Sequence, residues 1–110
     1  MTETKAIVVR TRELIADPKS WLQRKSARNS VGCTVGTRSS RAKSFCLFGA
    51  LDRASWELKT DLPAKTLRAL IADYLPPSSR VVDWNDAPRR THAQVLRLLD
   101  KAIAATARRP

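Results

Sequence analysis

The stretch Phe45-Cys46-Leu47-Phe48-Gly49-Ala50-Leu51 is the longest apolar run in the sequence, and it contains no charged residue. A helix that is apolar on nearly every side must be enclosed by other elements. We therefore expect a central helix over Ser39–Ala54, with Ser39 or Ser40 as its N-cap. Glycine destabilises a helix by roughly 0.5–1 kcal/mol relative to alanine, so the expected reason for Gly49 is the close approach of a neighbouring backbone.

The residues on the N-terminal side of this run predict two helices. Apolar residues recur at helical spacing over Thr4–Ala16, although the β-branched run Ile7–Val9 leaves a strand open for the first half. Asp17 before Pro18 is a favourable helix start, because proline lacks only an amide hydrogen that would be unpaired there. We expect a short helix from Pro18 to about Arg24.

Helical periodicity is lost over Lys25–Arg38. Asn29–Gly32 has the composition of a turn, and Cys33–Val35 contains strand-forming residues. A small β-hairpin or an ordered loop fits this segment best, and its charges predict an exposed, basic surface.

Two further helices are predicted after the central one. The first opens near Thr60–Pro63, keeps apolar residues at 3.6-residue spacing to Leu75, and is ended by the prolines that follow. Thr91–Gln94 has the capping-box pattern, in which hydroxyl and amide side chains satisfy two free backbone amides, and it predicts a last helix to about Ala107. Between these helices we expect a short β-branched pair and then a turn, at Val81-Val82 and Trp84–Pro88.

These patterns together predict an all-α fold. A chain of 110 residues is close to the commonest domain size, and its 43% hydrophobic residues can supply one core. We expect a single domain over residues 1–110, with four to five helices around the central apolar helix and at most one minor β-hairpin.

Charge is the strongest signal in the composition. The sequence has 21 Lys and Arg against 10 Asp and Glu, a net charge of +11, and no acidic residue lies between Gln23 and Leu51. Such a balance favours a polyanionic partner, although a face that is merely solvated is the alternative. The candidate contact residues are the six cations of that segment and two secondary cations further on: Arg24, Lys25, Arg28, Arg38, Arg41 and Lys43, then Arg89 and Arg90.

Nucleic acid is the favoured partner, because arginine makes forked, bidentate contacts with phosphate. No zinc-finger spacing, aromatic RNA-binding strand or helix-turn-helix can be placed in the sequence. We expect a small, non-enzymatic binding or regulatory module that contacts a polyanion. The first alternative is an adaptor or inhibitor that binds an acidic protein surface.

The second alternative is an enzyme with a cysteine nucleophile. Cys46, His92 and either Asn85 or Asp86 supply the residue types of a thiol, a base and an orienting group. Two points oppose it: Cys46 lies in the most apolar stretch, where burial makes a thiol inert, and His92 is expected to face solvent at the start of a helix. Two cysteines and one histidine without ligand spacing predict no metal site, and no phosphate-binding glycine motif or other cofactor site is found.

The expected location is the cytoplasm. Met1–Arg10 lacks the apolar core of a signal peptide, and no run reaches the roughly 18–20 apolar residues that span a bilayer. Cys33 and Cys46 do not form a disulfide framework, and free thiols are typical of a reducing compartment.

Three motifs give the chain a resemblance to a family. They are Cys46-Leu47-Phe48-Gly49-Ala50, Trp84-Asn85-Asp86, and Thr91-His92-Ala93-Gln94-Val95-Leu96, with Asp17-Pro18 and Trp21 before them. With these motifs the chain resembles an uncharacterised family of small bacterial helical proteins. The resemblance implies a single helical domain and brings no established activity, so no functional residue is carried over. In that pattern the loop before the central helix tends to be more acidic, whereas here it is wholly basic.

Overall fold

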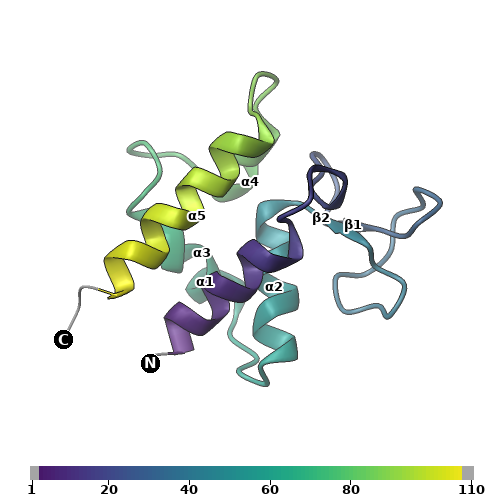
Figure 1. The fold of residues 1–110 in the computed structure, drawn as a ribbon, viewed down its shortest axis with the longest axis horizontal. Coiled ribbons are helices and arrows are strands. Elements are labelled where there is room, and N and C mark those ends of the chain that lie inside the picture. Colours follow the sequence, from purple (N-terminus) through teal and green to yellow (C-terminus); the bar gives the residue numbers. More distant parts are fainter. Residues whose placement is uncertain (1–2, 108–110) are drawn as a thin grey trace.

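The helix α2 (Leu47–Glu57) is the element around which the rest of the chain packs. In the computed structural model, which describes residues 3–107, α2 contacts α1 (Glu3–Leu14), α3 (Ala64–Ala72) and α4 (Val81–Asp86). The last helix, α5 (His92–Ala107), packs against α1 and α3. Figure 1 shows α1 and α5 side by side, with α2 on the other side of α1.

One hydrophobic core joins these helices. Ile7 on α1, Leu51 on α2 and Ile71 on α3 are fully buried in it, and Val95 and Leu99 extend it from α5. Five α-helices with α2 at their centre confirm the all-α prediction for the described residues.

The start of the central helix was predicted wrongly. It begins at Leu47 and not at Ser39, and its N-cap is Cys46, whose Sγ accepts a hydrogen bond from the Gly49 amide at 3.2 Å. The residues just before it form the strand β2 (Ser44–Phe45) instead. A tertiary pairing has therefore overridden the local preference for helix.

Strand β2 pairs antiparallel with β1 (Ala27–Arg28), with Ala27 opposite Phe45 and Arg28 opposite Ser44. The loop between the strands also contacts β1, because the Val35 amide donates a hydrogen bond to the Ala27 carbonyl at 3.1 Å. Ala27 and Phe45 face the core. The small β-element of the prediction is thus present, but its two strands are joined by a long loop.

Gly49 has the role that its position predicts. A Cβ atom at position 49 would lie 2.1 Å from the carbonyl oxygen of Ser26, which precedes β1. That same oxygen accepts from the Cys46 amide at 3.2 Å. The absence of a side chain therefore lets the backbone before β1 pack directly on α2.

Two short segments differ from the prediction. Pro18–Ser20 is a single 3-10 turn, η1, capped by the Asp17 side chain, and the chain is extended from Trp21. The β-branched pair Val81-Val82 and the predicted turn after it form the short helix α4. The Trp84 amide donates to the Arg80 carbonyl at 2.8 Å, which closes the first turn of α4.

The start of the last helix confirms the capping box. The Gln94 amide donates to Thr91 Oγ1 at 3.2 Å, and the Thr91 amide donates to Gln94 Oε1 at 3.0 Å. Among residues 3–107, no helix combines the length and the apolar character needed to cross a membrane.

Candidate polyanion-binding surface

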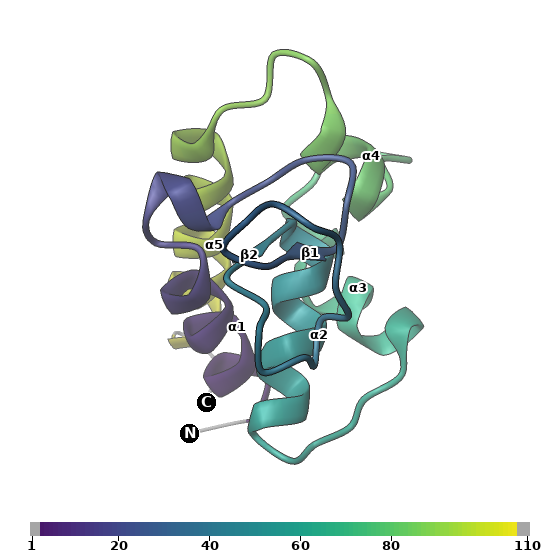
Figure 2. The same cartoon turned by 90° about the vertical axis from the view of Figure 1, so that its right-hand side faces the viewer.

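The segment that carries most of the predicted contact residues, residues 24–43, is here called the basic loop. It lies with β1 and β2 at one end of the long axis of the molecule (Figure 1), and Figure 2 turns this end toward the viewer. The loop carries two residues toward the core, Ala42, which is buried, and Val35, which is partly buried. In β1, Ala27 is buried and Arg28 is half-buried, whereas Arg24, Lys25, Arg41 and Lys43 are exposed.

The side chain of Asn85 on α4 forms hydrogen bonds to the chain on both sides of the segment that contains the basic loop and β2. It is fully buried, and its Oδ1 accepts from Trp21 Nε1 at 2.7 Å and from the Leu47 amide at 3.1 Å. Its Nδ2 donates to the Leu22 carbonyl at 3.1 Å. One amide group thus fixes the chain just before the basic loop and just after β2.

A second set of contacts orients the first residues of the loop. Gln23 Nε2 donates to the carbonyls of Asn85 and Ala87 at 2.8 and 2.9 Å. The Arg24 amide donates to Asp86 Oδ1 at 2.9 Å while Arg24 has a φ of 74°, a conformation that most side chains avoid. These bonds bring the beginning of the basic loop next to the α4–α5 turn.

The Asn29–Gly32 turn is confirmed, and it is held by its own asparagine. Asn29 Oδ1 accepts from the amides of Val31 and Cys33 at 3.1 and 2.9 Å, while Gly32 adopts a φ of 88°. Val31 at the tip of this turn is 78% exposed. The tip is therefore an ordered turn that presents an apolar side chain to solvent.

The side chains of five cations of the basic loop form no ion pair among the described residues: Arg24, Lys25, Arg28, Arg41 and Lys43. Three arginines of the helical body are paired. Arg10 and Arg53 both donate to Glu57 at 2.7 Å, and Arg12 donates to Asp100 at 2.6 Å. These pairs neutralise part of the positive charge of the body, whereas most of the charge of the loop is left without a counterion.

Arg38 is the exception within the loop. Its guanidinium lies 3.3 Å from Asp52 Oδ1 and 3.2 Å from Asp61 Oδ1. Thr37 Oγ1 donates to the other oxygen of Asp52 at 2.5 Å. Arg38 therefore anchors the loop to the body. The sequence did not indicate this, since both acids lie outside the basic segment.

The two secondary candidates also differ from each other. Arg89 is exposed, on the turn that Gln23 and Arg24 contact. Arg90 is engaged internally: its guanidinium stacks 3.9 Å from the centroid of the Trp84 ring, and its Nε donates to the Trp84 carbonyl at 2.9 Å. Neither arginine pairs with the neighbouring Asp86, whose Oδ1 accepts from the Arg24 amide and from Asn85 Nδ2.

Cys46, His92 and Asn85 have separate partners. Burial raises the pKa of the Cys46 thiol, and this outweighs the opposite effect of the hydrogen bond from the Gly49 amide. His92 is half-buried, in contrast to the expected solvent-facing side chain, and its Nε2 donates to the Ile15 carbonyl at 2.7 Å. Within residues 3–107, no hydrogen bond connects the thiol, the imidazole and Asn85.

No group of three or more His, Cys, Asp or Glu side chains in the described part of the chain is placed to hold a metal ion.

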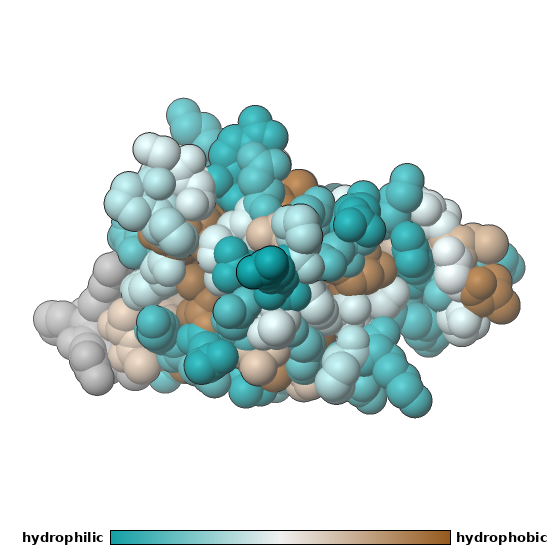
Figure 3. All heavy atoms as spheres, turned by 90° about the horizontal axis from the view of Figure 1, so that it is seen from above, coloured by the Kyte–Doolittle hydropathy of each residue, from teal (hydrophilic) through white to brown (hydrophobic). Residues whose placement is uncertain are grey.

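The face shown in Figure 3 is largely hydrophilic, with only scattered hydrophobic residues. This face therefore presents mainly polar groups, and no broad apolar patch, to a partner.

Comparisons with known proteins place the chain without assigning it an activity. Residues 1–105 match the model of a protein family described as a family of unknown function, DUF6197. No curated protein and no solved structure matches the chain.

Proposed function

The chain belongs to this family of unknown function, and we propose that it is a non-enzymatic binding module whose basic loop docks on the phosphate backbone of a nucleic acid. One observation carries the proposal. Residues 24–43 contain no acidic residue, and the side chains of five of their six cations form no ion pair among the described residues. The contact set consists of the five unpaired cations with Arg89 beside them: Arg24, Lys25, Arg28, Arg41, Lys43 and Arg89.

The proposed recognition depends on charge and not on base sequence. Lysine and arginine contacts to phosphates release condensed counterions, which gives affinity without sequence preference. The anchoring of the loop by Asn85 and Arg38 limits the ordering that binding would require. The proposed location is the cytoplasm, in agreement with two unpaired cysteines, one of them exposed.

An acidic protein surface is the second candidate, and Val31 is the observation that favours it. An exposed apolar side chain at the tip of a basic loop suits a protein partner, in which it could be buried inside a ring of ion pairs. A nucleic acid offers less to such a side chain. Val31→Ser should therefore weaken binding to a protein and leave binding to a nucleic acid unchanged.

The test is the salt dependence of binding to mixed-sequence duplex DNA and to RNA, followed by fluorescence anisotropy. Six phosphate contacts to duplex DNA predict a log–log slope of about −5.4 between about 50 and 200 mM salt. The triple variant R28E/R41E/K43E should lose about 100-fold in affinity and bring the slope to about −2.7.

The matched control changes the same amount of charge elsewhere. K59E/R97E/K101E replaces three exposed cations outside the basic loop. It should bind within about threefold of the native chain, because site contacts dominate at moderate salt. Equal losses in the two triple variants would mean that only net charge matters. That result, or no binding at low salt, rejects the proposed surface.

A further inference from the structure

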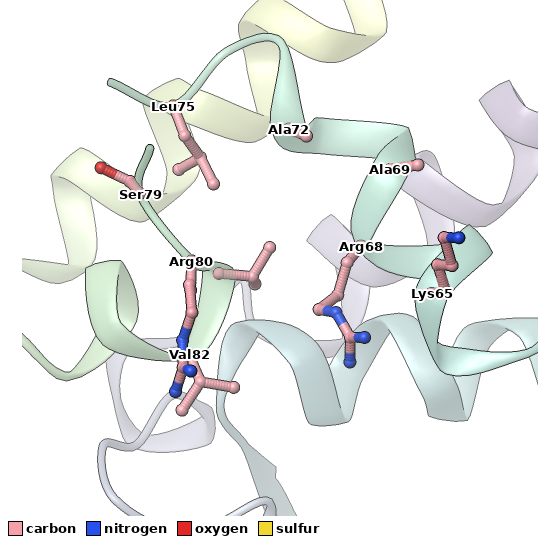
Figure 4. A pocket seen from close by; sticks show the side chains of 9 residues that line it. Lys65, Arg68, Ala69, Ala72, Leu75, Ser79, Arg80 and Val82 are labelled. Carbon is pink, nitrogen blue, oxygen red and sulfur yellow. The ribbon is translucent and has the colours of Figure 1, made fainter. Parts of the chain in front are cut away.

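A pocket of about 500 Å³ lies between α3 and the start of α4, away from the basic loop. Its floor is apolar, with Ala69 and Ala72 from α3, Leu75 after it, and Val81 and Val82 from α4. Figure 4 shows three further side chains that line it: Lys65, Arg68 and Arg80. Pockets of about 300–1,000 Å³ commonly hold small molecules, so its size is sufficient for one.

The spacing of the α3 residues explains why a cationic and an apolar surface meet here. Lys65, Arg68, Ala69 and Ala72 follow the i, i+3, i+4, i+7 pattern of a single helix face. The opposite face of α3 places Leu67 and Ile71 in the core. The pocket-lining face is thus cationic at its N-terminal end and covered by alanines toward its C-terminal end.

Arg68 and Arg80 come from opposite walls of the pocket, and their side chains extend in the same direction (Figure 4). Arg68 also stacks on Phe48, 5.8 Å from the ring centroid, which limits its rotation. Arg80 pairs with Asp83 at 2.9 Å, but both side chains are largely exposed, so this pair is weak and an anion can compete with it. Guanidinium groups therefore stand on both walls of the apolar floor, where each can meet a bound anion.

We propose that this pocket binds a small amphipathic organic anion. A carboxylate or phosphate head would bind between Arg68 and Arg80, and the apolar body would cover Val81 toward Ala72 and Leu75. Guanidinium groups recognise both head groups through forked, charge-assisted hydrogen bonds. The exposed alkyl surface of Val82, 39% accessible, would be partly covered by the same ligand. The proposal does not depend on nucleic-acid binding, since none of these residues belongs to the basic loop.

The experiment uses decanoate and decyl phosphate as probes, below their micelle concentrations, with binding followed by amide chemical shifts in NMR spectra and by calorimetry. Decanol and decyltrimethylammonium have the same chain with a neutral or a cationic head. Both anions should bind at least about tenfold more tightly than either of these controls. The relative affinity of the two anions identifies the preferred head group.

Two variants test the two parts of the pocket. Arg80→Gln should weaken anion binding about tenfold through loss of a charged donor, and Ala69→Leu should abolish it by filling the floor. Leucine replaces alanine in exposed helix positions at little cost to stability, so a folded variant is expected. The matched controls on exposed positions of α5, Arg97→Gln and Ala104→Leu, should bind like the native chain.

Several results would overturn the proposal. They are no anion binding below about millimolar concentration, equal affinity for decanol, or an Ala69→Leu variant that binds normally. Full displacement of decanoate by inorganic phosphate at the same concentration as decyl phosphate would also overturn it, because the pocket would then recognise charge alone.

Discussion

The carbonyl oxygen of Ser26 occupies the position in which a side chain on residue 49 would begin. A Cβ atom built on Gly49 lies 2.1 Å from that oxygen, well inside van der Waals contact. The close approach joins the backbone before β1 to the first turn of α2, and the Cys46 amide donates to the same oxygen. The packing of the strand pair on the central helix thus depends on the absence of one methyl group.

Gly49→Ala should therefore lower the free energy of unfolding by about 3 kcal/mol or more, since the clash is with backbone and cannot be relieved by a rotamer change. Urea denaturation followed by tryptophan fluorescence measures it. Gly36→Ala is the matched control, because nothing lies within 4 Å of a Cβ atom there. That variant should be neutral or more stable by about 0.5 kcal/mol. Similar stabilities of the two variants would contradict the close contact.

Asn85→Ala should destabilise the fold by about 3 kcal/mol. It removes a fully buried amide and leaves the Trp21 indole N–H and the Leu47 amide without their acceptor. Asn29→Ala, at an exposed turn, should cost only about 1 kcal/mol. Thermal or urea unfolding of both variants provides the comparison. An Asn85→Ala protein as stable as the Asn29→Ala protein would show that this hydrogen-bond network contributes little.

The fold should lose stability in acid, because the ionised Glu57 carboxylate stabilises it. Burial raises the pKa of Glu57, but the hydrogen bonds from Arg10 and Arg53 lower it further than burial raises it, so the net pKa lies below its ordinary value. A carboxyl of this kind stabilises the fold above its unfolded-state pKa of about 4.3, and the stabilisation disappears as the pH falls through the lower folded-state pKa. The free energy of unfolding should fall from about pH 5 downward.

Glu57→Gln should make this acid dependence shallower and cost about 1 kcal/mol at neutral pH, as both arginines are partly exposed. Glu13→Gln is the control, since Glu13 is largely exposed and its contact with Arg10 is longer, at 3.3 Å. Urea midpoints measured across the acid range test both variants. The same slope in the Glu57→Gln and native proteins would mean that other carboxyls cause the acid transition.

Cys46 should resist alkylation in the folded protein. The residue is 4% exposed, and burial raises the pKa of its thiol, so little thiolate forms. Cys33 in the exposed turn serves as the internal control. Mass spectrometry after iodoacetamide treatment should show Cys46 reacting on the order of 100-fold more slowly than Cys33, and equally fast in urea. A Cys46 that reacts faster than Cys33 in the native state would revive the cysteine-enzyme alternative.

Sequence patterns correctly predicted the features that depend on residues close together in the sequence. Thr91 and Gln94 satisfy each other across one helical turn, so their capping box could be predicted from four residues. The role of Gly49 was also predicted correctly, because a glycine inside an apolar helix is costly unless a neighbouring backbone needs the space. In both cases the residues that form the sequence pattern are also the residues whose physical properties explain the structure.

Features that depend on distant residues could not be predicted. His92 is bonded to Ile15, 77 positions earlier, and the partners of the Asn85 side chain include residues of two distant segments, Trp21-Leu22 and Leu47. Phe45 leaves the central helix because it pairs with Ala27, which no local window contains. For the same reason the counterions of Arg38 were missed, and with them the distinction between an anchoring cation and a free one.

The buried amide of Asn85 also holds the chain on both sides of the segment between β1 and β2. This segment contributes only Val35 and Ala42 to the interior, and Arg38 ties it to Asp52 and Asp61. Sequences of other length and charge could be grafted between these points, provided that the two apolar anchors and the Arg38 contact are kept. One helical body could then carry recognition loops for quite different partners, as antibody frameworks do.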